Sequence, residues 1–206
     1  MKSLVVGIHL ERDDIHVDAL HVDALPFGDL WLSGLAIVDG QPLADRDLVL
    51  RVARVRGELL DRATFIAVRY GAVAPPLPAI RPEWRDVLIA NRGNVEMTLK
   101  VAAASPKARP RREDFTSGAA YLRALHDTAA AADDSFRDAA ERAFSAIATR
   151  WRARDNASLE MAALIPRSRV EEVLAAGESL KRDFPRVPFL LSGPWPLEVF
   201  ADADQQ

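Results

Sequence analysis

The chain has 206 residues, of which 49% are hydrophobic and 28% charged, as expected for one large or two small globular domains. Its net charge of −3 does not favour binding to nucleic acid or to an anionic membrane, and the absence of cysteine excludes disulfides, thiolate metal sites and cysteine nucleophiles. The first residues, MKSLVVGIHLERDD, match neither a signal peptide nor a membrane span, so we expect a cytoplasmic protein.

A tandem pentapeptide, HVDAL, fills His16–Leu25, after an apolar run at Leu4–Leu10 that predicts a buried strand. Histidine and aspartate at this density suggest a metal site. On one continuous strand, however, His16 and Asp18 share a face whereas His21 points to the other. A metal needs three or four converging ligands. We therefore predict no metal at the repeat, which we interpret as a local duplication in a surface segment. Since the chain shows no cofactor motif, we predict no other cofactor either.

The first hundred residues alternate strands with helices. We expect strands at Leu30–Val38, Thr64–Tyr70 and Val95–Ala102, a helix from the N-cap Asp45 to Asp61, and helical turns at Glu83–Ala90. This order, β-β-α-β-(α)-β, is typical of a ferredoxin-like α+β fold. We predict an N-terminal ferredoxin-like domain at residues 1–104.

Residues 105–113, SPKARPRRE, form the clearest linker, with two prolines and four basic residues. A basic patch can contact nucleic acid, but no aromatic residue interleaves with this one. A solvated loop is the favoured interpretation.

The second half, residues 114–206, is predicted to be a second small α+β domain with a long helical segment. We expect helical structure over Thr116–Arg154, with Asp133–Ser135 as candidate caps between two helices. A strand at Ser158–Ile165, a helix at Arg167–Phe184 and a strand at Val187–Leu191 should follow.

The last strand leads into a stiff turn around Trp195. Pro194 and Pro196 fix their own φ angles and push Gly193 and Trp195 toward extended conformations. The tryptophan can then either plug the edge of the core or be presented to a partner. The sequence leaves both interpretations open.

No catalytic pattern is found: the chain has no Gly-rich phosphate loop, no G-x-S-x-G and no H-E-x-x-H. The four histidines lie in unrelated contexts, and Val95–Ala102 carries no aromatic residue of the kind that RNA-recognition strands use. We therefore expect no enzyme. The alternatives are a small-molecule-binding protein or an enzyme of unknown reaction, and a nucleic-acid binder.

Five segments, taken in order, resemble the gas-vesicle accessory family GvpF/GvpL. They are Ala67–Val73 (AVRYGAV), Gly93–Val101 (GNVEMTLKV), Ser117–Leu122 (SGAAYL), the strand Leu159–Ile165, and Leu191–Phe200 (LSGPWPLEVF). The last is the most specific, being similar to a family ending L-T-G-P-W-P-P-Y-x-F. Together they cover roughly residues 65 to 200.

The resemblance implies a non-catalytic role in gas-vesicle assembly, in the cytoplasm and at the gas vesicle. It implies binding to the small hydrophobic shell protein and to other accessory proteins, without nucleic acid or membrane. The candidate partner-binding residues come from the first and last motifs: Arg69, Tyr70, Gly193, Pro194, Trp195, Pro196 and Phe200. An exposed sheet edge is a further candidate, through β-augmentation.

Overall fold

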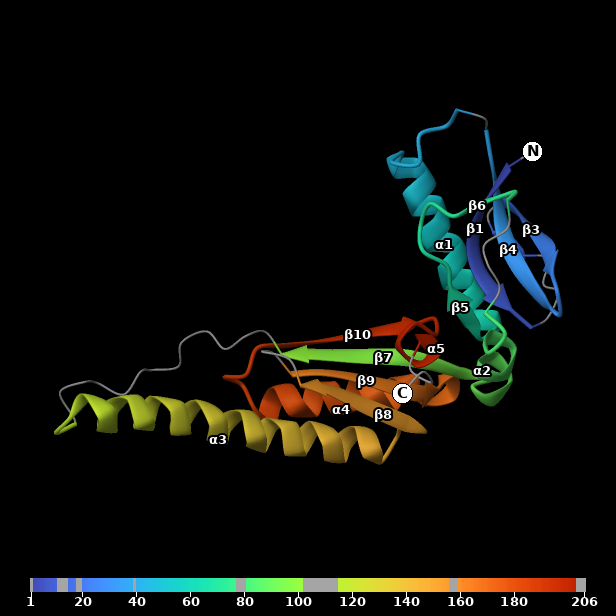
Figure 1. The fold of residues 1–206 in the computed structure, drawn as a ribbon. Helices are drawn as coiled ribbons and strands as arrows, with labels where there is room; N and C mark the ends of the chain where they lie inside the picture. Colours follow the sequence, from blue (N-terminus) through green and yellow to red (C-terminus); the bar gives the residue numbers. More distant parts are fainter. Residues whose placement is uncertain are drawn as a thin grey trace. The chain divides into compact units, whose positions relative to one another are not determined.

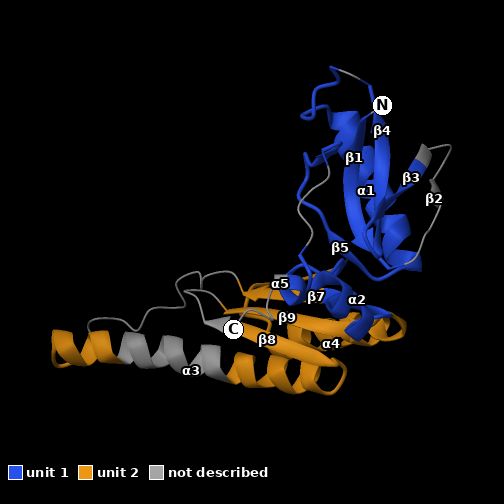
Figure 2. Ribbon diagram, turned by 45° about the vertical axis from the view of Figure 1, so that its right-hand side comes forward, with its two compact units in different colours: residues 1–96, 194–206 blue, residues 97–193 orange. Residues whose placement is uncertain are grey.

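A computed structural model describes residues 2–10, 15–17, 20–38, 40–76, 81–101, 115–155 and 159–202. The chain divides into two compact units, coloured separately in Figure 2. The first unit contains residues 1–96 and 194–206, and the second contains residues 97–193. Helices and antiparallel strands occur in both, which confirms the predicted α+β class.

The observed division differs from the predicted boundaries in two places. Residues 97–104, predicted to end the first domain, group with the second unit up to the last described residue, Val101. The sequence predicts that residues 194–206 end the second domain. They belong instead to the first unit, because Leu197 pairs with Phe65–Ala67, a strand of that unit. The predicted linker at 105–113 lies outside the described residues.

The described part of the first unit contains a six-stranded sheet (Figure 1). Its strands are β1 (Lys2–His9), β2 (Ile15–Val17), β3 (Leu20–Phe27), β4 (Leu30–Ile37), β5 (Phe65–Ala67) and β6 (Val73–Ala74). The order is β2-β3-β4-β1-β5, with β6 also paired to β1. Strand β1 runs antiparallel to β4, β5 and β6.

The HVDAL repeat spans parts of two strands, which corrects the single continuous strand assumed from the sequence. Strands β2 and β3 form an antiparallel hairpin whose register pairs His16 with His21 and Val17 with Leu20. The geometric reason given against a metal site at this repeat is therefore wrong, since it required both histidines on one strand. Among the described residues, no group of three or more potential ligand side chains is close enough to hold a metal ion.

Helix α1 (Arg46–Arg62) confirms the predicted amphipathic helix. Asp45 is its N-cap, because its carboxylate accepts the backbone N–H of Asp47 at 2.9 Å. The apolar residues at three- and four-residue spacing pack against β1, β4 and β5 to form the core of this unit. They are Leu48, Val52, Val55 and Leu59. Helix α2 (Trp84–Ala90) buries Val87 and Leu88.

The ferredoxin-like order is found in the second unit and its adjoining strand ends, and not in the first hundred residues. The elements are β7 (Asn94–Val101), α3 (Gly118–Ser145), β8 (Arg150–Asp155), β9 (Leu159–Pro166), a 3-10 turn at Arg167–Arg169, α4 (Val170–Asp183) and β10 (Phe189–Trp195). They follow the order β-α-β-β-α-β, and the sheet order is β10-β7-β9-β8. The predicted placement was wrong because β7 does not pair with β1 but joins β9 and β10.

Helix α3 is one helix through Asp133–Ser135 and ends at Ser145, before the predicted end at Arg154. The helical spacing continued to Trp151 because this residue, although in β8, also packs on the core of the second unit. Helices α3 and α4 cover that core with Phe136, Phe144, Val173 and Leu180.

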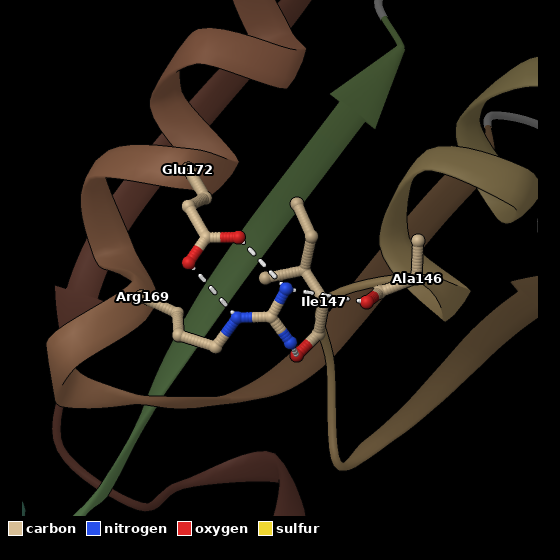
Figure 3. Close-up of polar contacts among 4 residues, drawn as sticks. All are labelled: Ala146, Ile147, Arg169 and Glu172. Carbon is tan, nitrogen blue, oxygen red and sulfur yellow. Dashed lines mark hydrogen bonds and ion pairs between the residues drawn. The ribbon is translucent and has the colours of Figure 1, made fainter.

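The end of α3 is fixed by the side chain of Arg169 (Figure 3). Its guanidinium donates to the backbone carbonyls of Ala146 and Ile147 at 3.3 and 3.0 Å, just after the last turn of α3. It also makes a bidentate pair with Glu172 at 3.0 and 2.7 Å. Two carbonyls at the helix end therefore accept hydrogen bonds from a charged side chain.

Candidate partner-binding site

A cavity of about 720 Å³ lies in the first unit, where β5, α1, α2 and the C-terminal segment meet. Its apolar lining comes from the sheet residues Ile8 and Ile66, from Trp84 of α2 and from Leu197. Four charged side chains complete the lining: Arg56, Arg69, Arg81 and Glu198. The cavity is of the size that proteins use for small ligands or for a few side chains of a partner.

The turn after β5 forms one wall of this cavity. The backbone N–H of Ala72 donates to the carbonyl of Arg69 at 3.3 Å, and Gly71 has φ of 98°. A turn with a positive φ at its third residue favours glycine there, which explains the Arg-Tyr-Gly sequence. The hydroxyl of Tyr70 donates to the carbonyl of Leu43 at 2.6 Å. The turn therefore has a fixed shape, and the Arg69 side chain is exposed on it.

The C-terminal segment contributes Leu197, Glu198 and Ala201 to the lining. The N–H of Leu197 donates to the carbonyl of Phe65 at 2.9 Å, and the N–H of Ala67 donates to the carbonyl of Leu197 at 3.4 Å. Leu197 thus extends the sheet beside β5, in parallel orientation. The short helix α5 (Val199–Asp202) begins immediately afterwards.

Glu96 holds the start of α5. Its carboxylate accepts three successive backbone N–H groups, those of Glu198 and Phe200 at 2.8 Å and that of Val199 at 3.0 Å. Burial raises the pKa of Glu96, and these three hydrogen bonds act in the opposite direction. This contact joins two of the family-like motifs that are far apart in the chain, Gly93–Val101 and Leu191–Phe200.

Positive charge dominates the cavity, with three arginines against one glutamate. The Arg56 side chain donates to the carbonyl of Val68 at 2.5 Å, while its buried Nε has no hydrogen-bond acceptor among the described residues. Burial lowers the pKa of Arg56, and the nearby charge of Glu198 opposes this shift. The guanidinium of Arg81 lies over the ring of Trp84, 5.7 Å from its centre.

The comparisons with known proteins identify the family. The family model described as "Gas vesicle synthesis protein GvpL/GvpF" matches residues 37–201. The chain belongs to the GvpL/GvpF family. The resemblance read from the sequence motifs is thereby confirmed, and the family supports a role in gas vesicle formation.

Two solved GvpF structures share this fold. The chain is similar to GvpF from Anabaena sp. PCC7120, with a TM-score of 0.71, 15% sequence identity, and coverage of 98% of this chain and 99% of the other. GvpF from Microcystis aeruginosa gives a TM-score of 0.71 with 14% identity and the same coverages. No curated protein matches the sequence.

The residues expected to bind partners in this GvpL/GvpF protein fall into two groups. Arg69 and Tyr70 line the cavity, whereas Gly193, Pro194, Trp195 and Pro196 do not. Trp195 is 47% exposed, so it does not plug the core. Phe200 is completely buried, and its proposed contact with a partner is corrected to a role in packing.

Sequence reasoning missed Arg56, Arg81 and Trp84 as cavity residues, and Glu96 as the residue that holds α5. An arginine on the polar side of a helix carries no local sign that it faces a cavity, which explains Arg56. The role of Glu96 could be suspected from the sequence, because it is an acidic residue in a half-buried strand. Burial of a carboxylate requires hydrogen-bond donors.

His9 is 1% exposed, and its Nε2 lies 2.8 Å from the hydroxyl of Ser33, so it has a hydrogen-bond partner in the core.

None of the described helices combines the length and apolar character needed to cross a membrane.

Proposed function

We propose that this GvpL/GvpF protein is a non-catalytic accessory protein that acts in the cytoplasm. In this role it binds the small hydrophobic shell protein, and other accessory proteins, during gas vesicle assembly. Membership of the family is the observation that carries the proposal. A very apolar shell protein needs a partner surface with exposed apolar side chains before it assembles.

Strand β10 and the turn at its end are the proposed binding surface. In the described sheet β10 is an edge strand, because the order begins β10-β7. It exposes 62% of Leu190 and 47% of Trp195, whose backbone is restrained by Pro194 and Pro196. An edge strand can pair with an extended segment of a partner, and a rigid tryptophan is a common energetic anchor.

Co-expression with the shell protein tests this proposal. The accessory protein should recover the shell protein from the soluble fraction, and Trp195→Ala should weaken the measured affinity by roughly 30-fold, as loss of a hot spot does. Leu122→Ala, a truncation of an exposed side chain on α3, is the matched control. If wild-type protein and Trp195→Ala capture the shell protein equally well, Trp195 is not part of the binding surface.

A small-molecule-binding function is the second candidate. The cavity of about 720 Å³ and the altered pKa of Arg56 favour it, because a shifted titratable group in a cavity is typical of ligand sites. Calorimetry with small organic anions tests this candidate.

A further inference from the structure

We infer that the cavity of the first unit binds a carboxylate-bearing peptide segment, with apolar residues beside the acidic one, from a partner protein. The inference rests on the proposed function, since it assigns this second surface to recognition of a partner. It is distinct from the strand β10 surface, because the cavity lining contains neither Trp195 nor any other residue of β10.

The arrangement of the arginines supports a carboxylate ligand. Arg56, Arg69 and Arg81 come from α1, from the turn after β5 and from the segment before α2. Two of them are already restrained, Arg56 by the carbonyl of Val68 and Arg81 by the ring of Trp84. The buried Nε of Arg56 has no acceptor among the described residues. A carboxylate suits this site, because guanidinium groups bind carboxylates through paired, planar hydrogen bonds.

The apolar lining supports a peptide in preference to an isolated anion. Ile8, Ile66, Leu197 and the ring of Trp84 line the same cavity as the arginines. Inorganic phosphate would leave these surfaces without a contact. An acidic side chain flanked by aliphatic ones would cover both kinds of lining, and burial of apolar area would add to the charge attraction.

Removal of the Glu198 charge should change the affinity for an acidic peptide in the direction opposite to removal of an arginine charge. Glu198 lines the cavity and its charge acts on Arg56. In the free protein the negative charge of Glu198 therefore offsets part of the positive potential that would attract an acidic ligand. Removal of this charge should strengthen binding of an acidic peptide, whereas a purely structural role would not.

Fluorescence polarisation with a short fluorescein-labelled peptide, two glutamates flanked by leucines, tests the inference on the full chain. The peptide should bind, and its glutamine counterpart should bind at least tenfold more weakly. Arg69→Gln and Arg81→Gln should each weaken binding by roughly tenfold, and Glu198→Gln should strengthen it several-fold. Arg54→Gln, the same charge change at an exposed position of α1 outside the cavity, should leave the affinity unchanged.

Three results of the peptide assay would overturn the inference even if the acidic peptide binds. They are equal binding of the acidic and glutamine peptides, equal weakening by Arg54→Gln and Arg69→Gln, and displacement of the peptide by inorganic phosphate at comparable concentration. The last would instead indicate a small-anion site. Shell-protein capture is measured separately on the same samples. If the acidic peptide fails to bind while capture persists, the inference falls and the proposed function stands. If wild-type protein captures no shell protein, the proposed function falls.

Discussion

The buried carboxylate of Glu96 accepts the backbone N–H of Phe200 at 2.8 Å, across 104 positions of sequence. Glu96 is 2% exposed and lies in β7, whereas Phe200 lies in α5 and is completely buried. The same carboxylate also binds the N–H groups of Glu198 and Val199. One side chain therefore orders the C-terminal segment that lines the cavity.

Glu96→Ala should destabilise the first unit strongly. The substitution removes the acceptor of three N–H groups at the start of a helix, and we expect a loss of about 2–4 kcal/mol in the free energy of unfolding. Glu160→Ala is the control, because Glu160 of β9 forms an ion pair with Lys100, a side chain that is 57% exposed, and should cost less than about 1 kcal/mol. Urea unfolding of both variants measures the difference. Similar losses in the two would contradict the role of Glu96.

The same residue should make stability depend on pH. Burial raises the pKa of Glu96, so the folded state holds the proton to higher pH than the unfolded state. The stability contributed by the protonated form is then fully present below the unfolded pKa, near 4.5, and is lost as pH rises through the folded pKa. The difference in unfolding free energy between wild type and Glu96→Gln should therefore shrink with rising pH. A difference that grows instead would show that the three hydrogen bonds outweigh burial.

Gly193→Ala should be destabilising because Gly193 has φ of 127°. A residue with a Cβ is strained at this angle, and we expect a cost of about 1–3 kcal/mol. Gly57→Ala gives the contrast: Gly57 lies within α1, where an added Cβ would meet nothing within 4 Å. That substitution should stabilise by about 0.5–1 kcal/mol. Thermal melts compare the two, and a stabilised Gly193→Ala would contradict the argument.

The parts of the fold that depend on local signals could be predicted. The N-cap Asp45 and the apolar spacing of α1 are encoded within one short segment, and the helix was placed to within a residue. Strand pairing is different, because nothing within Asn94–Val101 indicates whether it joins β1 or β9. The local pattern therefore predicts the ferredoxin-like unit in the wrong half of the chain.

The candidate cavity was predictable only through its motifs. Arg69 and Tyr70 are predicted to bind a partner because they belong to a family-like segment, and they line the cavity. Phe200 is predicted on the same basis but is buried, since a motif residue can serve packing as readily as binding. Arg56 and Arg81 have no distinguishing sequence context. Their common location follows from tertiary structure alone.

Arg169→Ala should loosen the connection between α3 and β8. Arg169 holds the carbonyls of Ala146 and Ile147, and its pairing with Glu172 lowers the pKa of that carboxyl (Figure 3). Hydrogen exchange should become faster at the amides of residues 146–149, where the chain leaves the helix. Arg182→Ala serves as the control, because it removes an exposed arginine whose guanidinium donates to the hydroxyl of Ser179 in the same helix. Unchanged exchange in Arg169→Ala would contradict the assignment.

Truncation of the two aromatic residues of the terminal motif should lower the free energy of unfolding by very different amounts. Phe200 is completely buried, so Phe200→Ala should cost about 3–5 kcal/mol through lost apolar burial and the resulting cavity. Trp195 is 47% exposed and loses less on truncation, so we expect about 1–2 kcal/mol. Because domains are stable by only about 5–15 kcal/mol, Phe200→Ala should be partly unfolded at moderate urea concentrations where Trp195→Ala remains folded. Circular dichroism along a urea titration measures both midpoints. If Trp195→Ala is as destabilising as Phe200→Ala, Trp195 is a packing residue and β10 loses its proposed anchor.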